Sequence, residues 1–466
     1  MATPRRGMAG WWDERLGLTP LVDKLLRRHV PTGLTWWYSL GAATLFVLLV
    51  LFVTGVLLAF NYAPTPQDAY DSVRYIENEV PFGWFIRGLH HWGASAMIAL
   101  VVLHMASAFV LGAHRYPREA TWLAGVVLLL VSFAFGFTGY LLPWDQKAYW
   151  ATTVGTNMAG TVPVVGSALV SLARGGTELG AATLARFYAL HVLVLPALVI
   201  TFVVVHLALV VYHGVSVPPG AWARMRGDYQ ARYAEAKAHG PRFWPEVIAE
   251  DLVLSLLVFL VLVGLTLFAG VPLEDRADPT DAAYIPRPEW YFLSLFQLLK
   301  LFPGSWEWVG VALVPAAIVL LLFLVPFLSR GAERRPLKRP LGTITLAVLG
   351  LGAAGLTAWA AATTPPATVV ERGAVLTSLQ LRGKQIIGQE GCASCHIING
   401  EGGRNGPSLD GIRVRMTAAD IHSFMERPMA FNPVATMQPL LPRISHENVE
   451  AITQYLLSLD GGSASR

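Results

Sequence analysis

The chain has 466 residues, of which 54% are hydrophobic and only 14% charged, and its formal net charge is +4 at pH 7. This composition is typical of a polytopic membrane protein rather than a soluble one. The small positive charge gives no reason to expect a nucleic-acid partner.

The N-terminal segment, residues 1–30, is charged and lacks the apolar core of a cleavable signal peptide. It predicts an amphipathic helix at the membrane surface, and a solvated helix fits nearly as well. Seven apolar stretches long enough to span a bilayer follow it: 34–60, 84–112, 121–143, 184–212, 250–271, 307–329 and 341–362. The sequence therefore predicts an all-α membrane protein with seven transmembrane helices.

Basic residues indicate how these helices are oriented. Lysine and arginine gather before the first span and after the second, fourth and sixth: Arg5, Arg6, Lys24, Arg27, Arg28, Arg115, Arg118, Arg224, Arg226, Arg232, Lys237, Arg242, Arg330, Arg334, Arg335, Lys338 and Arg339. By the positive-inside rule this side is the cytoplasmic one, and we expect a bacterial cytoplasmic (inner) membrane. Seven spans then place the N-terminus inside and the C-terminus outside.

The span 84–112 carries His90 and His104, fourteen residues apart. At about 100° per residue, the two lie within about 40° of one helix face and about 21 Å apart along the axis. Ionisable groups inside a membrane span are costly, so by default they mark a functional site. One histidine is thus expected near each side of the membrane.

The span 184–212 repeats this arrangement with His191 and His206, fifteen residues apart. The offset of about 1,500° still leaves both on roughly one face. Pro196 lies between them and can kink the helix, which would absorb the extra residue.

Two helices with two matched histidines each can hold two haems b across the bilayer, each iron taking one histidine from each helix. The expected pairs are His90 with His191 near the outer face and His104 with His206 near the inner face. Hydrogen-bonded core histidines or a proton path are the alternative. We would favour that alternative for a single histidine, but not for four histidines at matching depths in the membrane.

Glycines in the first and third spans support the haem interpretation. Gly41 and Gly55 are fourteen residues apart, and so are Gly125 and Gly139. A flat porphyrin needs a gap where a side chain would stand, and glycine leaves one. Ordinary small-residue helix packing is the alternative. Orientation places Gly55 and Gly139 with the outer histidines and the other two with the inner histidines.

Three motifs, R-G-L-H-H-W-G-A-S, G-Y-L-L-P-W-D-Q and R-F-Y-A-L-H, occur within residues 10–215. This part resembles the cytochrome b family of Rieske-type quinol oxidoreductases, and more closely its chloroplast b6 branch. The resemblance implies a four-helix dihaem domain at 31–215. It also implies that Arg87 pairs with a propionate of the outer haem; an interfacial arginine is the alternative. The branch tethers an extra haem by a cysteine, but Ser39 stands at that position, so we expect no third membrane haem.

A polar cytoplasmic connector at 216–247 leads to residues 248–363, which resemble the separate three-helix subunit IV of the b6 branch. P-E-W-Y-F at 288–292 is the motif of its quinol-oxidation site. The resemblance implies that Glu289 and Tyr291 are catalytic, with Glu289 accepting a quinol proton. A carboxylate at an apolar interface can act as such a base. A solvated loop acid is the alternative.

A linker at 364–376 precedes a domain at 377–466 that contains Cys392-Ala-Ser-Cys395-His396. C-x-x-C-H is the attachment motif of a covalent haem c, with His396 as axial ligand. A disulfide or redox pair is the alternative, and the adjacent histidine argues against it. The domain resembles class I cytochromes c, which implies a methionine as sixth ligand: Met437 is better placed than Met425 or Met429.

The sequence contains no C-x-H…C-x-x-H pair, so a separate Rieske iron–sulfur protein must accept the first electron. The expected function is a subunit of a proton-translocating quinol–cytochrome c oxidoreductase. It would oxidise quinol at the outer face, pass electrons through two b haems to an inner quinone and deliver others through haem c to a cytochrome c or similar acceptor. We expect a homodimeric complex in contact with membrane lipid. A dihaem anchor that only conducts electrons is one alternative, and a transporter with buried histidines and no haem is another.

Overall fold

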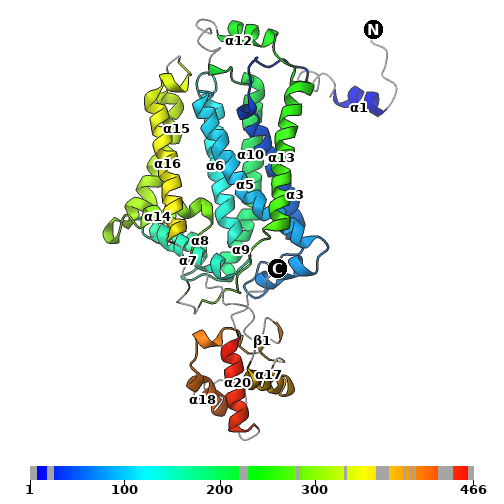
Figure 1. Ribbon diagram of the computed structural model, residues 1–466. Helices are drawn as coiled ribbons and strands as arrows, with labels where there is room; N and C mark the ends of the chain where they lie inside the picture. The colour runs from blue at the N-terminus through cyan, green and yellow to red at the C-terminus, as the bar shows by residue number, and fades with distance from the viewer. Residues whose placement is uncertain are drawn as a thin grey trace. The chain divides into compact units, whose positions relative to one another are not determined.

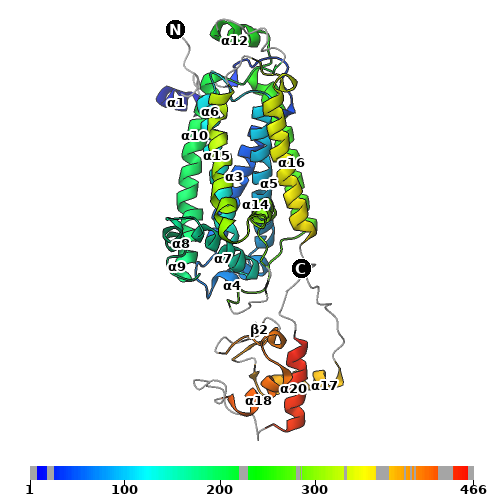
Figure 2. The ribbon, with the colours of Figure 1, turned by 90° about the vertical axis from the view of Figure 1, so that its left-hand side faces the viewer.

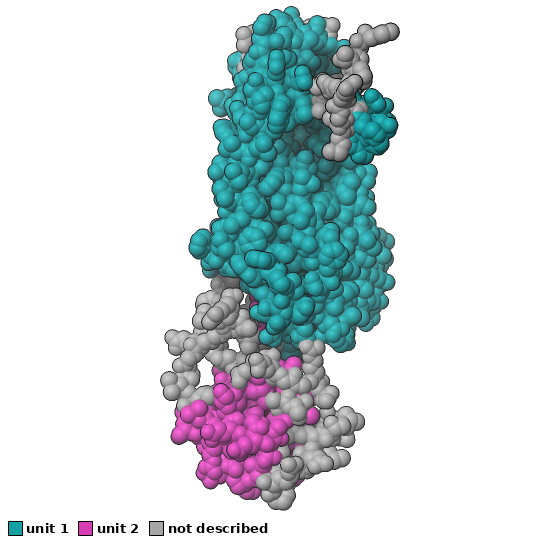
Figure 3. Space-filling model, turned by 90° about the vertical axis from the view of Figure 1, so that its right-hand side faces the viewer, with its two compact units in different colours: residues 1–272, 276–363 teal, residues 273–275, 364–466 magenta. Residues whose placement is uncertain are grey.

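The computed structural model describes residues 8–17, 26–219, 229–279, 284, 286–329, 333–363, 377–392, 395–398, 401–402, 406–428 and 444–459. The chain forms two compact units, residues 1–272 with 276–363 and residues 273–275 with 364–466 (Figure 3). The first unit contains the apolar spans, and the second contains the C-x-x-C-H motif.

Within the described residues, seven helices are long and apolar enough to cross a membrane: Trp36–Ala59, Gly83–Val110, Glu119–Tyr140, Ala181–His213, Phe243–Phe268, Val309–Leu328 and Pro340–Ala362. Each overlaps one predicted span, which confirms the all-α, seven-helix architecture of a multi-pass membrane protein. Helices are expected here because in lipid every backbone N–H and C=O must be satisfied within the segment itself.

The first four spans form a bundle that is visible in Figures 1 and 2. Its helices are α3 (Leu40–Ala59), α5 (Gly83–Val110), α6 (Glu119–Tyr140) and α10 (Leu195–His213). Helix α3 packs on α5, α5 on α6 and α6 on α10, around buried side chains such as Val47, Leu100, Val131 and Val199. Helix α13 (Ile248–Phe268) adds Leu262 to the same core. Two of the predicted haem-ligand histidines lie on α5 and the other two lie on the fourth span. The bundle packs these two helices around one core.

The fourth span contains a π-helical turn, η2 (Leu190–Val194), between α9 (Ala181–Ala189) and α10. The backbone N–H of Leu195 donates to the carbonyl of Leu190, five residues earlier. A π-turn inserts one extra residue into an α-helix. Pro196, which lacks an N–H, follows directly at the start of α10. The step from His191 to His206 is one residue longer than the step from His90 to His104, and this turn accommodates the extra residue. His191 itself lies in the turn.

The remaining elements of the first unit lie at the ends of the spans or complete its second half. They are α1 (Met8–Leu16), η1 (Trp36–Tyr38), α4 (Ala69–Asn78), α7 (Gln146–Gly160), α8 (Gly166–Arg174), α12 (Tyr229–Ala238), η3 (Phe243–Val247), η4 (Trp290–Phe292), α14 (Leu293–Leu299), η5 (Gly304–Trp306), η6 (Val309–Leu313), α15 (Val314–Leu328), η7 (Pro336–Lys338) and α16 (Pro340–Ala362). Helix α14 packs against α16, and α15 packs against α6. The three-helix second half is therefore joined to the four-helix bundle in one unit.

Polar contacts hold these two halves together at buried positions. The indole N–H of Trp122 donates to the carbonyl of Leu322 at 2.8 Å. Arg334 has 0% of its surface exposed, and its guanidinium donates to Ser216 Oγ at 2.9 Å and to the carbonyl of Tyr116 at 3.0 Å. Burial, together with the nearby Arg118 guanidinium, lowers the pKa of Arg334 to about 9, so the side chain is still charged at neutral pH.

We expect Arg334→Leu to destabilise the membrane unit. Each buried polar group that loses its partner costs about 1–3 kcal/mol, and this substitution removes the donor from two of them. Loss of b-haem absorbance on heating the purified protein in detergent should therefore occur at a lower temperature. The matched control is Arg335→Ala, because that side chain is 42% exposed and its ion pair with Glu333 is a surface one. An equal effect of the two substitutions would contradict this interpretation.

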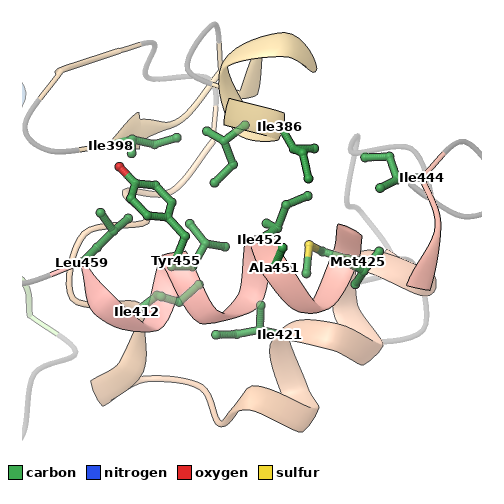
Figure 4. Close-up of a cluster of buried hydrophobic side chains, with 13 residues drawn as sticks. Ile386, Ile398, Ile412, Ile421, Met425, Ile444, Ala451, Ile452, Tyr455 and Leu459 are labelled. Atoms are coloured by element: carbon green, nitrogen blue, oxygen red, sulfur yellow. The ribbon is translucent and has the colours of Figure 1, made fainter. Parts of the chain in front are cut away.

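The second unit contains α17 (Ser378–Gln389), β1 (Ile397–Ile398), β2 (Glu401–Gly402), η9 (Ile412–Val414), α18 (Ala418–Glu426) and α20 (His446–Ser458). Strands β1 and β2 pair antiparallel. Helix α20 packs on both α17 and α18. Its buried residues Ile452, Tyr455 and Leu456 meet Ile386 and Met425 in one hydrophobic core (Figure 4). The unit is a small helical domain with its own core.

Candidate functional site

The structure brings His90 of α5 and His191 of η2 together, with ring centres 6.4 Å apart and ring planes at 70°. Metal–imidazole bonds of about 2.0 Å on opposite sides of one ion would place the two ring centres about 6.4 Å apart. The spacing of this outer pair therefore fits one six-coordinate iron between two imidazoles.

Two threonines hold the outer histidines by their Nδ1 atoms. Thr54 Oγ1 lies 2.9 Å from His90 Nδ1, and Thr138 Oγ1 lies 3.1 Å from His191 Nδ1. Each hydroxyl donates to a carbonyl in its own helix at 2.8 Å, so it accepts from the imidazole N–H. The proton is thereby held on Nδ1, which leaves Nε2 free to bind metal. Sequence reasoning missed these threonines, although each directly precedes a predicted outer glycine.

The inner pair, His104 and His206, has nearly the same geometry, with ring centres 6.5 Å apart and planes at 76°. In the described structure, Nδ1 of neither histidine has a hydrogen-bond partner. The two half-buried imidazoles again face each other at a separation that fits one shared metal ion. The difference from the outer pair indicates two non-equivalent sites.

All four predicted glycines lie against these histidines. A Cβ atom built on Gly139 would come within 2.6 Å of His191 Cε1, and one on Gly41 within 3.0 Å of His104 Cε1. The corresponding distances are 3.2 Å from Gly55 to His90 and 3.5 Å from Gly125 to His206. The expected reason was space for a porphyrin. The structure adds another, since the imidazole edge itself occupies the place of the missing side chain.

A cavity of about 590 Å³ opens beside the inner pair. Cofactor sites typically measure about 300–1,000 Å³. Its lining includes His104 and His206, apolar residues such as Val101, Leu128 and Val203, and the charged residues Arg28 and Asp251. Ser39 is buried and also lines this cavity. The size and the mostly apolar lining of this cavity therefore fit a large, mostly apolar prosthetic group.

Glu289 is not the solvated loop acid that was considered as an alternative. Its side chain is 16% exposed, and Oε1 accepts a hydrogen bond from Lys147 Nζ at 2.6 Å. His91, the residue after His90, lies close enough to interact electrostatically with both groups. The carboxylate is thus next to the N-terminal part of α5. Sequence reasoning missed Lys147, which lies 142 residues away but directly follows the G-Y-L-L-P-W-D-Q motif.

Aromatic side chains enclose this region. The Tyr291 ring packs against Gly136, where a Cβ would come within 3.0 Å of it, and its centre lies 4.9 Å from that of Phe292. Phe292 in turn contacts Phe137 and Tyr140 of the third span. The P-E-W-Y-F motif therefore forms an apolar wall next to one acid–base pair.

Arg87 has partners other than the expected propionate. The side chain is buried, and it donates to Glu77 Oε1 at 3.0 Å and to the carbonyls of Val271 and Pro272 at 3.3 and 2.9 Å. In the structure it therefore links the connection after the first span to the end of the fifth span. Its role toward a propionate stays a prediction.

The C-x-x-C-H motif lies in the second unit. His396 Nδ1 lies 2.8 Å from the carbonyl of Pro407, which fixes the proton on Nδ1 and leaves Nε2 for metal. A Cβ on Gly406 would come within 2.5 Å of His396 Cε1. Cys392 and Cys395 are not joined by a disulfide. Burial raises the pKa of the Cys392 thiol, whereas redox C-x-x-C pairs depend on a lowered one. These residues fit covalent haem attachment better than disulfide exchange.

The predicted sixth ligand, Met437, lies outside the described residues, as does Met429. Met425 is on α18 and is buried in the domain core against α20, so it packs as a core residue. Met437 stays a prediction.

Three family profiles match the chain in succession. They are described as cytochrome b/b6/petB for residues 25–214, cytochrome b(C-terminal)/b6/petD for residues 276–379 and cytochrome c for residues 380–460. The order is the one expected from the motifs, and the cytochrome b and cytochrome c parts imply haem cofactors.

Individual proteins agree with the profiles. A cytochrome bc complex cytochrome b subunit of Chlorobaculum thiosulfatiphilum is 40% identical over 348 residues, 73% of this chain and 77% of that protein. Cytochrome b6 of Acaryochloris marina is 42% identical over 45% of this chain and 97% of its own. The solved structure of a hyperthermophilic respiratory Complex III superposes with a TM-score of 0.68 at 27% identity, over 77% of this chain and 92% of that one. The chain therefore belongs to the cytochrome b family: it is the cytochrome b subunit of a bc-type complex, with b6-like and petD-like parts fused to a C-terminal cytochrome c domain.

Proposed function

We propose that this subunit oxidises quinol at the outer face of the membrane, passes one electron to a Rieske partner and the other inward to a quinone, and releases two protons outside. Electron exit is through the fused cytochrome c domain to a cytochrome c or similar acceptor. The observation that carries the proposal is the Glu289–Lys147 pair beside the P-E-W-Y-F wall, close to the outer end of α5. A dihaem conduit would not need an acid–base pair there.

Glu289 is the group that we assign to proton transfer. Quinol oxidation releases two protons, and a positioned carboxylate within hydrogen-bond reach of the hydroxyl can accept one of them. Lys147 Nζ donates to Glu289 Oε1 at 2.6 Å and so holds the carboxylate in position. Tyr291 packs against Gly136 and Phe292 and forms part of the apolar wall beside the carboxylate.

The haem sites are assigned to the histidine pairs described above and to Cys392, Cys395 and His396. When bound, the haems supply one-electron redox centres. The protein holds Nε2 of His90, His191 and His396 free by fixing the proton on Nδ1. The orientation, with the cytochrome c domain on the outer face, rests on the basic connections and the odd number of spans.

Haem content tests this assignment. A pyridine haemochrome spectrum of the purified chain should show haem b and haem c near two to one, and a haem stain of a denaturing gel should be positive. Cys392→Ser with Cys395→Ser should abolish the stain and leave both haems b. A transporter with buried histidines would contain no haem. Covalent haem remaining in the double variant would contradict attachment through these two cysteines, which are the only ones in the sequence.

A further inference from the structure

Three metal-ligating side chains that have no part in the haem sites meet on the cytochrome c domain. His422 and Glu426 lie one turn apart on α18, and His446 is the first residue of α20. One ligand atom from each lies within 4.8 Å of the other two. We propose that His422, Glu426 and His446 bind one divalent transition-metal ion, with Zn²⁺ as the best-suited ion.

The distances between the ligand atoms fit a metal site better than direct hydrogen bonds. Glu426 Oε1 lies 3.4 Å from His422 Nδ1 and 3.5 Å from His446 Nδ1. Hydrogen bonds between N and O measure about 2.7–3.2 Å, so both are too long. Ligands at about 2.0–2.2 Å around a tetrahedral Zn²⁺ lie about 3.3–3.5 Å from one another. Two of the three distances between ligand atoms, those from Glu426 Oε1 to the two Nδ1 atoms, therefore already have the length that a tetrahedral site requires.

The backbone holds the three ligands in place. His422 and Glu426 share one helix face because they are four residues apart. On the same helix, Ile421 and Met425 are buried in the domain core, which fixes α18 against α20. Ser445 caps α20 by accepting a hydrogen bond from the backbone N–H of Asn448, directly before His446. The two imidazole rings are parallel to within 8°, with centres 6.0 Å apart. The third distance, between the two histidines, is within 4.8 Å, so closing the site requires the imidazoles to approach each other.

The donor set and its exposure select the class of ion. Two imidazoles and one carboxylate suit Zn²⁺ and other late first-row divalent ions, whereas Mg²⁺ and Ca²⁺ prefer oxygen ligands. The side chains of His422 and Glu426 are 28% and 26% exposed, and that of His446 is 76% exposed, so an ion can enter from solvent. Three protein ligands leave a fourth position for water. The ion would cross-link α18 to α20, the helices on either side of the stretch that contains Met437 in the sequence.

The test is equilibrium dialysis of the purified full-length haem-loaded protein, first stripped with EDTA, against buffered free Zn²⁺, with bound zinc measured by mass spectrometry. The wild type should bind one more equivalent than His422→Ala with His446→Ala. Glu426→Gln should weaken that binding by at least the 10–100-fold that changes around a metal site typically cost. X-ray absorption at the zinc edge of the wild type should show two imidazole ligands.

His239→Ala is the matched control, because His239 is an exposed histidine in the cytoplasmic connector and should leave zinc binding unchanged. The c-haem spectrum of each variant checks that the domain is folded. His446→Ala alone removes a mostly exposed side chain, so it keeps the test valid if the double variant does not fold. Equal zinc content and affinity in the wild type and in a folded His446→Ala variant would overturn the proposal.

Discussion

Glu289→Gln should slow quinol-driven reduction of the haems by about 10²–10⁴-fold, the range of general-base catalysis, or somewhat less if water substitutes. Glutamine keeps the shape of the side chain but can neither accept a proton nor pair ionically with the Lys147 ammonium, 2.6 Å away in the structure. All three haems should remain bound, because no predicted haem ligand is altered. Stopped-flow reduction by quinol, with the Rieske partner present, measures the effect.

Two controls separate loss of the base from damage to the protein. Reduction by dithionite bypasses the quinol site and should proceed at the wild-type rate in the variant. Glu79→Gln removes an exposed acid from the outer loop and should leave quinol oxidation unchanged. Wild-type quinol turnover in the Glu289→Gln complex would refute the assignment and favour the dihaem conduit.

Replacing either histidine of one pair should remove one haem b and leave the other. His90→Ala and His191→Ala should eliminate the same spectral component, and His104→Ala and His206→Ala the other, because the ring centres pair at 6.4 and 6.5 Å. The ratio of haem b to haem c would fall from about two to about one, since an iron that keeps a single axial histidine is held far less well. Reductive titration followed at the b-haem absorption band identifies the component.

His213→Gln is the matched control, because His213 ends the same helix as His206 but is not a predicted ligand. Both haems b should remain in it. If His90→Ala and His206→Ala removed the same component, the pairing would be wrong.

Sequence reasoning was most informative for features that depend only on residues close together in the chain. Helical periodicity alone places His90 and His104 on one face, and the seven spans follow from the length of the apolar stretches. It could not find the two carbonyl partners of Arg87, which lie 184 and 185 residues away in the chain. The π-turn at His191 was also out of reach. A proline predicts that a helix is disturbed, but whether the extra residue enters as a kink or as a π-turn depends on how α6 and α10 pack.

In the candidate quinol site, too, sequence reasoning identified one residue and missed another. The motif P-E-W-Y-F identified Glu289, because a motif this specific indicates the site without information from distant residues. Lys147 was not identified, because nothing in the sequence near Glu289 specifies which residue of a distant helix pairs with its carboxylate. The buried Arg334 was likewise assigned only to a cytoplasmic connection, since a count of basic residues does not reveal which of them the fold encloses.

The Glu289–Lys147 contact has a consequence for assembly. Its two residues come from stretches that match separate family profiles, and one continuous chain carries both. Docking of the two stretches is therefore unimolecular and does not depend on protein concentration. A flexible connection gives an effective concentration in about the millimolar range, however dilute the subunit is in the membrane. The stoichiometry of the two halves is fixed at one to one by translation, so neither can accumulate as an orphan with an exposed apolar face.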